Sequence, residues 1–176
     1  KSVKLALKDE SKITFKGSNS KIKYRLSNFT INHNRYLHHL FNINVNKKII
    51  FYASDPSKEQ AQRYYIEKFL FEYFSNKLDY IFIVKTHSQD DGKVTNYAFV
   101  DAGLPSNCIL IGDMKQKNKI VSKQFRLFNK FDFNSAMINC DGFITSTSSS
   151  ILESLALGVK SGIVDLFSNG NYNYLI

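Results

Sequence analysis

Short apolar runs separated by helical patterns are the feature that most limits the folds open to this chain of 176 residues. The runs are apolar at nearly every position, which is typical of strands buried on both faces of a parallel sheet. Five of them occupy residues 48–53, 78–85, 108–112, 142–146 and 162–165. Strands that alternate with helices predict an α/β domain with a doubly wound, mainly parallel sheet.

The longest segment between these runs predicts a helix of four to five turns that ends at Ser75. Asp55 is the expected N-cap, followed by Pro56 in the first turn. Ser57 and Gln60 offer an alternative capping box. The apolar face of this helix is expected to contain Tyr65, Ile66, Phe69, Leu70 and Tyr73.

The other segments are less regular. Weaker helical patterns cover residues 93–103 and 131–139, and residues 113–130 are interpreted as a mobile basic loop that passes into a helix. The lysines of this loop are interpreted mainly as a solvated surface: Lys115, Lys117, Lys119 and Lys123. Cys108 and Cys140 lie in or beside apolar segments and are predicted to be buried free thiols.

The net charge of +9 belongs to the start of the chain, because residues 1–48 hold eleven Lys and Arg against two acidic residues. We therefore divide the chain into a basic segment, residues 1–46, and an α/β domain, residues 47–176. The chain begins with Lys, so we interpret the basic segment as a linker or the remnant of a missing upstream domain. A solvated face, an anionic membrane surface and a nucleotide-linked substrate all remain open as its role. A nucleic acid is disfavoured as a partner because no module signature accompanies the charge.

Within the basic segment, alternating residues predict short strands near residues 3–7, 13–15 and 22–26. Residues 35–41 predict a short helix with Asn34 or Asn32 as N-cap. His33, His38 and His39 have no Cys or acidic partner nearby, so no metal site is expected. No apolar run approaches the roughly 20 residues that span a bilayer, and we expect a cytoplasmic protein with at most peripheral contact at the inner membrane face.

A run of six hydroxyl residues, 145–150, follows the fourth apolar run. It leads into a predicted helix over residues 149–157 that is closed by Gly158. Free backbone N–H groups at the start of a helix form a site for anions. Ser150 and Glu153 also match a capping box, which stabilises a helix by about 1 kcal/mol without any ligand. The choice depends on whether the helix starts at Ser148, leaving Glu153 open to a ligand, or is capped by Ser150.

Ligands of doubly wound sheets bind outside the carboxyl ends of the strands. His87 follows the second apolar run, and a histidine there is suited to contact a phosphate or transfer a proton. Lys85 adds a positive charge to the same edge if it does not extend into solvent. The chain contains neither the glycine pattern of dinucleotide-binding Rossmann sites nor that of P-loop kinases.

Three segments carry a resemblance to a known family: residues 47–54, 83–87 and 141–158. Together they resemble the carboxyl-terminal, donor-binding half of a GT-B-fold transferase, over residues 47–167. The nearest branches are bacterial surface-polysaccharide glycosyltransferases and the CDP-glycerol glycerophosphotransferases of teichoic-acid assembly. UDP-N-acetylglucosamine 2-epimerases share this architecture. The chain departs from the glycerophosphotransferase pattern at Thr86, Ser88 and the pair Ser146-Thr147.

The resemblance implies roles for individual residues. Thr147, Ser148, Ser149 and Ser150 would face the donor phosphates, with Lys85 adding positive charge. Glu153 would hold the ribose hydroxyls and His87 would be catalytic.

The function implied is the nucleotide-sugar-binding half of a glycosyltransferase that builds capsule, lipopolysaccharide or teichoic acid. Its substrate would be a UDP-, CDP- or GDP-linked donor, with no covalently bound cofactor and no metal. A glycan or lipid-linked acceptor would come with the missing amino-terminal domain, so the fragment alone is expected to be inactive. A glycerophosphotransferase or epimerase is the alternative within this fold, and a non-catalytic module that docks on a polyanion or a membrane is the alternative from another class.

Overall fold

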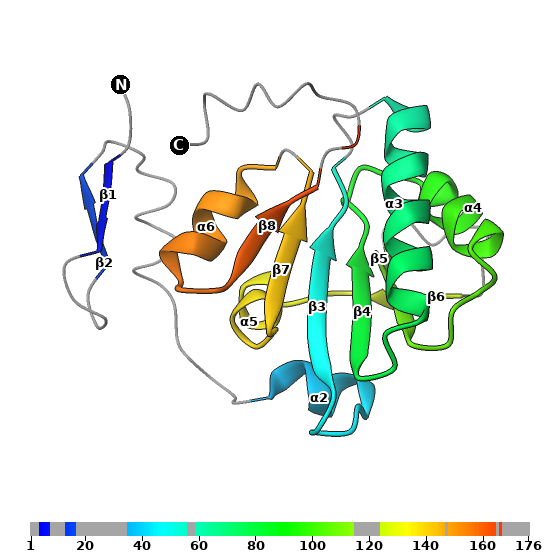
Figure 1. Cartoon of the computed structure of the whole chain (residues 1–176), viewed down its shortest axis with the longest axis horizontal. Helices are drawn as coiled ribbons and strands as arrows, with labels where there is room; N and C mark the ends of the chain where they lie inside the picture. Colours follow the sequence, from blue (N-terminus) through cyan, green and yellow to red (C-terminus); the bar gives the residue numbers. More distant parts are fainter. Residues whose placement is uncertain are drawn as a thin grey trace.

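A six-stranded, all-parallel sheet forms the centre of the molecule (Figure 1). The computed structural model describes residues 4–7, 13–16, 35–55, 59–114, 124–146, 148–164 and 166. The strands are β3 (Lys48–Ala53), β4 (Tyr80–Lys85), β5 (Cys108–Asp113), β6 (Phe125–Phe128), β7 (Gly142–Thr145) and β8 (Ser161–Ile163). Their order in the sheet is β6-β5-β4-β3-β7-β8. The fold is therefore the predicted Rossmann-like, doubly wound α/β fold, and all five predicted strands are confirmed.

Strand β6 corrects the prediction of a helix within residues 113–130. Phe125 and Leu127 pack with one apolar cluster, whereas Phe128 packs with the cluster on the other side of the sheet. Arg126 lies on the same side as Phe128, with its guanidinium over the Phe41 ring. Side chains that alternate between the two sides in this way are typical of a strand. The predicted basic loop, with Lys115, Lys117, Lys119 and Lys123, lies outside the described residues.

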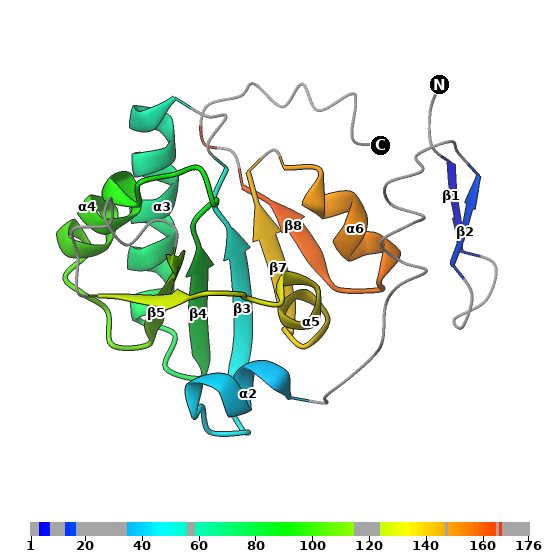
Figure 2. The ribbon, with the colours of Figure 1, turned by 180° about the vertical axis from the view of Figure 1, so that it is seen from behind.

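Helices cover both faces of the sheet. On one face lie α3 (Gln60–Ser75) and α4 (Lys93–Asp101), in front in Figure 1. On the other lie α2 (Tyr36–Phe41), α5 (Phe133–Ile138) and α6 (Ser150–Ala156), of which α2 and α5 are in front in Figure 2. Alternate residues of β3 enter opposite clusters, since Tyr52 packs under α3 and Phe51 under α5. Burial on both faces explains why the strands are apolar at nearly every position.

The predicted buried face of α3 is wrong in part. Tyr65, Phe69 and Tyr73 are 56%, 44% and 52% exposed, although Ile66 and Leu70 are buried as expected. Two charged residues take inner positions instead, because Arg63 and Glu67 pair with partners beneath the helix. The remaining inner positions are filled by Phe71 and Phe74.

The predicted start of α3 is also wrong. The helix begins at Gln60. Its N-cap is Glu59, whose side chain accepts no capping hydrogen bond from the described first turn. Asp55 lies too far before this point to cap the helix, and it is buried at the end of β3. Gln60 is the first helical residue, which is not the third position that a capping box from Ser57 requires. Pro56 and Ser57 lie outside the described residues.

The basic segment contains a separate antiparallel pair, β1 (Lys4–Leu7) with β2 (Ile13–Lys16), as its alternating pattern predicts. The third predicted strand, residues 22–26, lies outside the described residues. The predicted cap of α2 is wrong, because the N-cap is Arg35 with a left-handed φ of 70°. The Asn139 side chain accepts hydrogen bonds from the N–H groups of Arg35 and Tyr36 at 2.8 and 3.4 Å, so a residue distant in sequence replaces the local cap.

Candidate functional site

A cleft of about 390 Å³ opens at the carboxyl ends of the strands. Strands β3 to β6 follow one another toward one edge of the sheet, and the chain then returns to place β7 on the other side of β3. The strand order reverses between β3 and β7, which is where doubly wound sheets bind ligands. The cleft is lined by Ala53, Ser54, Lys85, Thr86, His87, Ser88, Asp113, Phe128, Phe131, Phe133, Ser148, Ser149, Ser150 and Glu153.

The structure brings together the described residues that the sequence predicts for a site: His87, Lys85, Ser148, Ser149, Ser150 and Glu153. Their presence in one cleft follows from the fold, because the carboxyl ends of parallel strands meet at one edge of a sheet. Thr147, the remaining predicted residue, lies outside the described part of the chain.

The serine turn, Ser148 to Ser150, forms the wall after β7. Ser149 is the N-cap of α6 but makes no side-chain cap hydrogen bond. The backbone N–H of Ser150 donates instead to Ser148 Oγ at 3.3 Å. Ser150 is thus the first helical residue rather than the cap, so the capping box with Glu153 is not formed. Gly158 has a left-handed φ of 73° after the last turn, as predicted for a residue that closes the helix.

The Ser150 hydroxyl is buried without a hydrogen-bond partner among the described residues. The residue as a whole is 8% exposed. A buried hydroxyl without a partner costs about 1–3 kcal/mol relative to a satisfied one. Because Ser150 lines the cleft, a polar ligand there would supply the partner.

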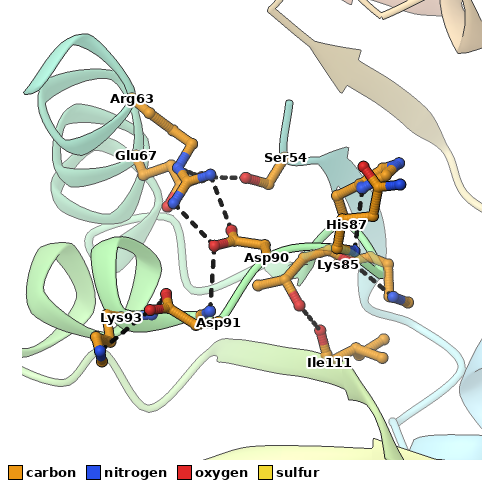
Figure 3. Close-up of polar contacts among 12 residues, drawn as sticks. Ser54, Arg63, Glu67, Lys85, His87, Asp90, Asp91, Lys93 and Ile111 are labelled. Carbon is orange, nitrogen blue, oxygen red and sulfur yellow. Dashed lines mark hydrogen bonds and ion pairs between the residues drawn. The ribbon is translucent and has the colours of Figure 1, made fainter. Parts of the chain in front are cut away.

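Lys85 and His87 form the wall after β4. Lys85 Nζ donates to the carbonyl oxygen of Thr86 at 2.6 Å, and Thr86 Oγ1 donates to the carbonyl oxygen of Ile111 at 3.1 Å (Figure 3). Burial lowers the pKa of Lys85, an effect that the nearby Asp113 carboxylate opposes. The exposed His87 accepts a hydrogen bond at Nδ1 from the Gln89 N–H at 3.2 Å, which assigns the proton of the neutral ring to Nε2.

Three phenylalanines, Phe128, Phe131 and Phe133, form an aromatic wall. The Phe128 and Phe131 rings lie 5.6 Å apart, and Phe133 packs 5.5 Å from the core ring of Phe51. All three are half-buried, so ring surface remains open to the cleft. The sequence interpretation placed Phe128 in a basic loop that passes into a helix, and Phe131 and Phe133 in a weak helical pattern. Three phenylalanines within six positions beside a polar loop are nevertheless a usable signal.

Ser54 forms the wall of the cleft after β3, and a buried ionic network of Arg63, Glu67 and Asp90 lies behind it. Ser54 Oγ donates to Glu67 Oε1 at 2.6 Å (Figure 3). Arg63 binds both carboxylate oxygens of Asp90, at 2.9 and 3.1 Å. Asp90 ends a turn in which its N–H donates to the His87 carbonyl, so the network holds the loop that carries His87.

Sequence reasoning missed this network because it assigned aromatic residues to the inner face of α3. Burial raises the pKa of Glu67 to about 7, against the hydrogen bond from Ser54 and the charge of Arg63. The signal that could have revealed it is Arg63 four residues before Glu67 in an otherwise apolar helix.

Neither cysteine lines the cleft, and both are free thiols as predicted, but only Cys108 is buried and Cys140 is half-buried. Burial raises the pKa of each of the Cys108 and Cys140 thiols to about 12. Within the described part of the chain, no three His, Cys, Asp or Glu side chains are grouped so as to hold a metal ion. His38 is buried, with Nε2 2.9 Å from the Lys47 carbonyl oxygen. None of the described helices has the length and apolar character needed to cross a membrane.

Comparison with protein-family models, curated proteins and solved structures gives no match for this chain. The geometry of the cleft is therefore the basis for assigning a function to the chain.

Proposed function

We propose that the cleft binds the nucleotide-diphosphate donor of a glycosyltransferase that builds a bacterial cell-surface polysaccharide. The observation that carries the proposal is the pairing of a serine turn with an aromatic wall at the point where the strand order reverses. Ligand sites of this kind join apolar surface to a few convergent polar groups.

The serine turn suits the phosphates of the donor. Ser150 Oγ has no hydrogen-bond partner within the part of the chain that the structure describes, and a phosphate oxygen is a strong acceptor for its proton. Lys85 adds a positive charge from the opposite wall of the cleft. A bound anion would favour the charged form of this lysine and so oppose the effect of its burial.

The aromatic wall suits the base, and Glu153 suits the ribose. A nucleobase stacks on aromatic rings with a gain of about 1–3 kcal/mol, whichever base it is. Glu153 lies in the first turn of α6, lines the cleft and is nearly buried. Its carboxylate is an acceptor for the two ribose hydroxyls.

The chemistry assigned to the cleft is electrostatic. The serine hydroxyls and Lys85 would stabilise the negative charge that develops on the leaving diphosphate. His87 lines the cleft with its neutral-ring proton on Nε2, from which it can donate a hydrogen bond to an oxygen of the leaving diphosphate and stabilise its charge. A CDP-glycerol glycerophosphotransferase is the second candidate, because the placement of His87 in the cleft agrees with the histidine of that branch.

Calorimetry with UDP, CDP, GDP and inorganic pyrophosphate tests the proposal. Wild-type protein should bind at least one nucleotide more tightly than pyrophosphate, because pyrophosphate cannot use the aromatic wall. Ser150→Ala should weaken nucleotide binding about tenfold, the effect of losing one hydrogen bond to a charged group. The same variant should unfold at an equal or higher temperature, since it removes a buried hydroxyl without a partner.

Ser75→Ala is the matched control, because Ser75 lies at the end of α3 and contacts only the Glu72 carbonyl among the described residues. It should leave nucleotide binding unchanged. A Ser150→Ala variant that is destabilised but binds normally would show that the serine turn only supports the fold. Absence of binding to every nucleotide would refute the proposal.

A further inference from the structure

The Ser54 side chain connects the cleft to the buried ionic network. Ser54 lines the cleft, and its hydroxyl lies 2.6 Å from Glu67 Oε1. Glu67 is 1% exposed, and its carboxyl meets the Ser54 hydroxyl from α3 (Figure 3). Because Ser54 contacts both the cleft and Glu67, an anion bound at Ser54 would change the protonation equilibrium of the Glu67 carboxyl.

Charged and titratable groups face Glu67 from each element around it. Arg63 of the same helix places Nε 4.0 Å away, and Asp90 of the loop after β4 shares the Arg63 charge. Tyr52 of β3 is the third neighbour, because burial and, second to it, the Glu67 charge raise the pKa of its hydroxyl. Among the described residues, the Arg63 charge is thus shared by the carboxyl groups of Glu67 and Asp90, and the Asp90 charge disfavours the ionised form of Glu67. Burial raises the pKa of Glu67 in the same direction.

The Ser54 hydroxyl has a single proton to donate. When Glu67 is ionised, this proton is used in the bond to Glu67, and Ser54 presents only lone pairs to the cleft. When Glu67 is protonated, its own O–H can donate to the Ser54 oxygen, and the Ser54 proton can turn toward the cleft. An anion accepts hydrogen bonds and so favours the second arrangement.

We propose that Ser54 is an anion-binding residue of the cleft and that Glu67 is its proton partner, so that an anionic ligand binds together with one proton. The inference rests on the proposed function, because the ligand's phosphates are the anion in question. The proton enters from the solvent of the cleft onto the Ser54 oxygen, and the original Ser54 proton passes to Glu67. The products are a neutral Glu67 and a Ser54 hydroxyl that donates to the phosphate.

Calorimetric titration with UDP and with inorganic pyrophosphate, in buffers of different ionisation enthalpy, measures the protons taken up. Protonation of the ligand itself is common to all variants and cancels when they are compared. At pH 7 the wild type should take up about half a proton more than Glu67→Gln. Its affinity should fall toward tenfold per pH unit well above the pKa of Glu67.

Glu67→Gln retains an N–H that can donate to Ser54, so it should bind with an affinity that lacks this pH dependence. Ser54→Ala should bind more weakly and also lose the additional uptake, and it tests the proposal independently if the first variant folds poorly. Ser148→Ala is the matched control, because it removes a hydroxyl of the other wall, where Ser148 Oγ accepts from the Ser150 N–H. It should bind more weakly but keep the uptake.

Binding with the same proton uptake in wild type and Glu67→Gln would overturn this inference and leave the nucleotide site standing. Loss of the uptake in Ser148→Ala would also overturn it, because the titrating group would then lie elsewhere. Absence of binding to either probe in the wild type would overturn the proposed function and this inference together.

Discussion

Two serine-bearing walls meet in the cleft, and they are held in place in different ways. The serine turn after β7 has mostly local contacts, such as the bond from the Ser150 N–H to Ser148 Oγ. Ser54 after β3 is bonded to Glu67 of α3, and the same network reaches Asp90 beyond β4. The first wall can be recognised in a short stretch of sequence, whereas the second exists only after three distant segments meet. Each wall can be tested by a change that leaves the other in place.

The largest expected effect comes from removing the single positive charge of the network. Arg63→Met leaves Glu67 and Asp90 as buried carboxylates without their cation, and breaking a buried pair in this way costs about 3–5 kcal/mol. Denaturant unfolding measures the loss. Lys68→Met is the matched control, because Lys68 pairs with Glu72 on the exposed side of the same helix. That exposed pair contributes at most about 0.5 kcal/mol. Equal, small losses in both variants would show that the network is not needed to support its wall.

The second effect is a pH dependence of stability. Burial raises the pKa of Glu67 from 4.5 to about 7, so its contribution to stability is complete below pH 4.5 and is lost as the pH rises through 7. Between pH 5 and pH 8 the wild-type free energy of unfolding should fall by about 2–3 kcal/mol from this group. Glu67→Gln should lack that fall, and denaturant unfolding at several pH values measures the difference. Parallel pH curves for the two proteins would contradict the assignment.

The smallest effect compares two helix starts. Asp132 caps α5 by accepting from the Ser135 N–H at 3.0 Å, whereas the Ser149 side chain accepts no capping hydrogen bond from the described residues of α6. Asp132→Ala should cost about 1 kcal/mol, and Ser149→Ala only a few tenths. Thermal unfolding measures both. If Ser149→Ala lost as much unfolding free energy as Asp132→Ala, the serine turn would be shown to stabilise the helix rather than to serve a ligand.

The same contrast explains how far the sequence predicts this molecule. Strands buried on both faces can be predicted because nearly every position is apolar, and the serine turn can be predicted because its hydroxyl residues are consecutive. The Arg63–Glu67–Asp90 network was missed because a charged residue in a helix pattern is normally exposed. The cap of α2 was missed for a similar reason, since its acceptor, Asn139, comes from the far end of α5. Interactions between distant segments are set by the fold and not by local pattern.

The position of β3 between β4 and β7 has a consequence for how the chain folds. Strand β4 follows β3 after one helix, whereas the Ile49 N–H meets the Asp141 carboxylate 92 residues further along the chain. Loop closure favours the nearer partner, and pairings between distant segments form slowly. We expect β3, α3 and β4 to associate early and bring Ser54 and His87 together. The serine turn would then arrive last, so ligand binding would report completion of the fold.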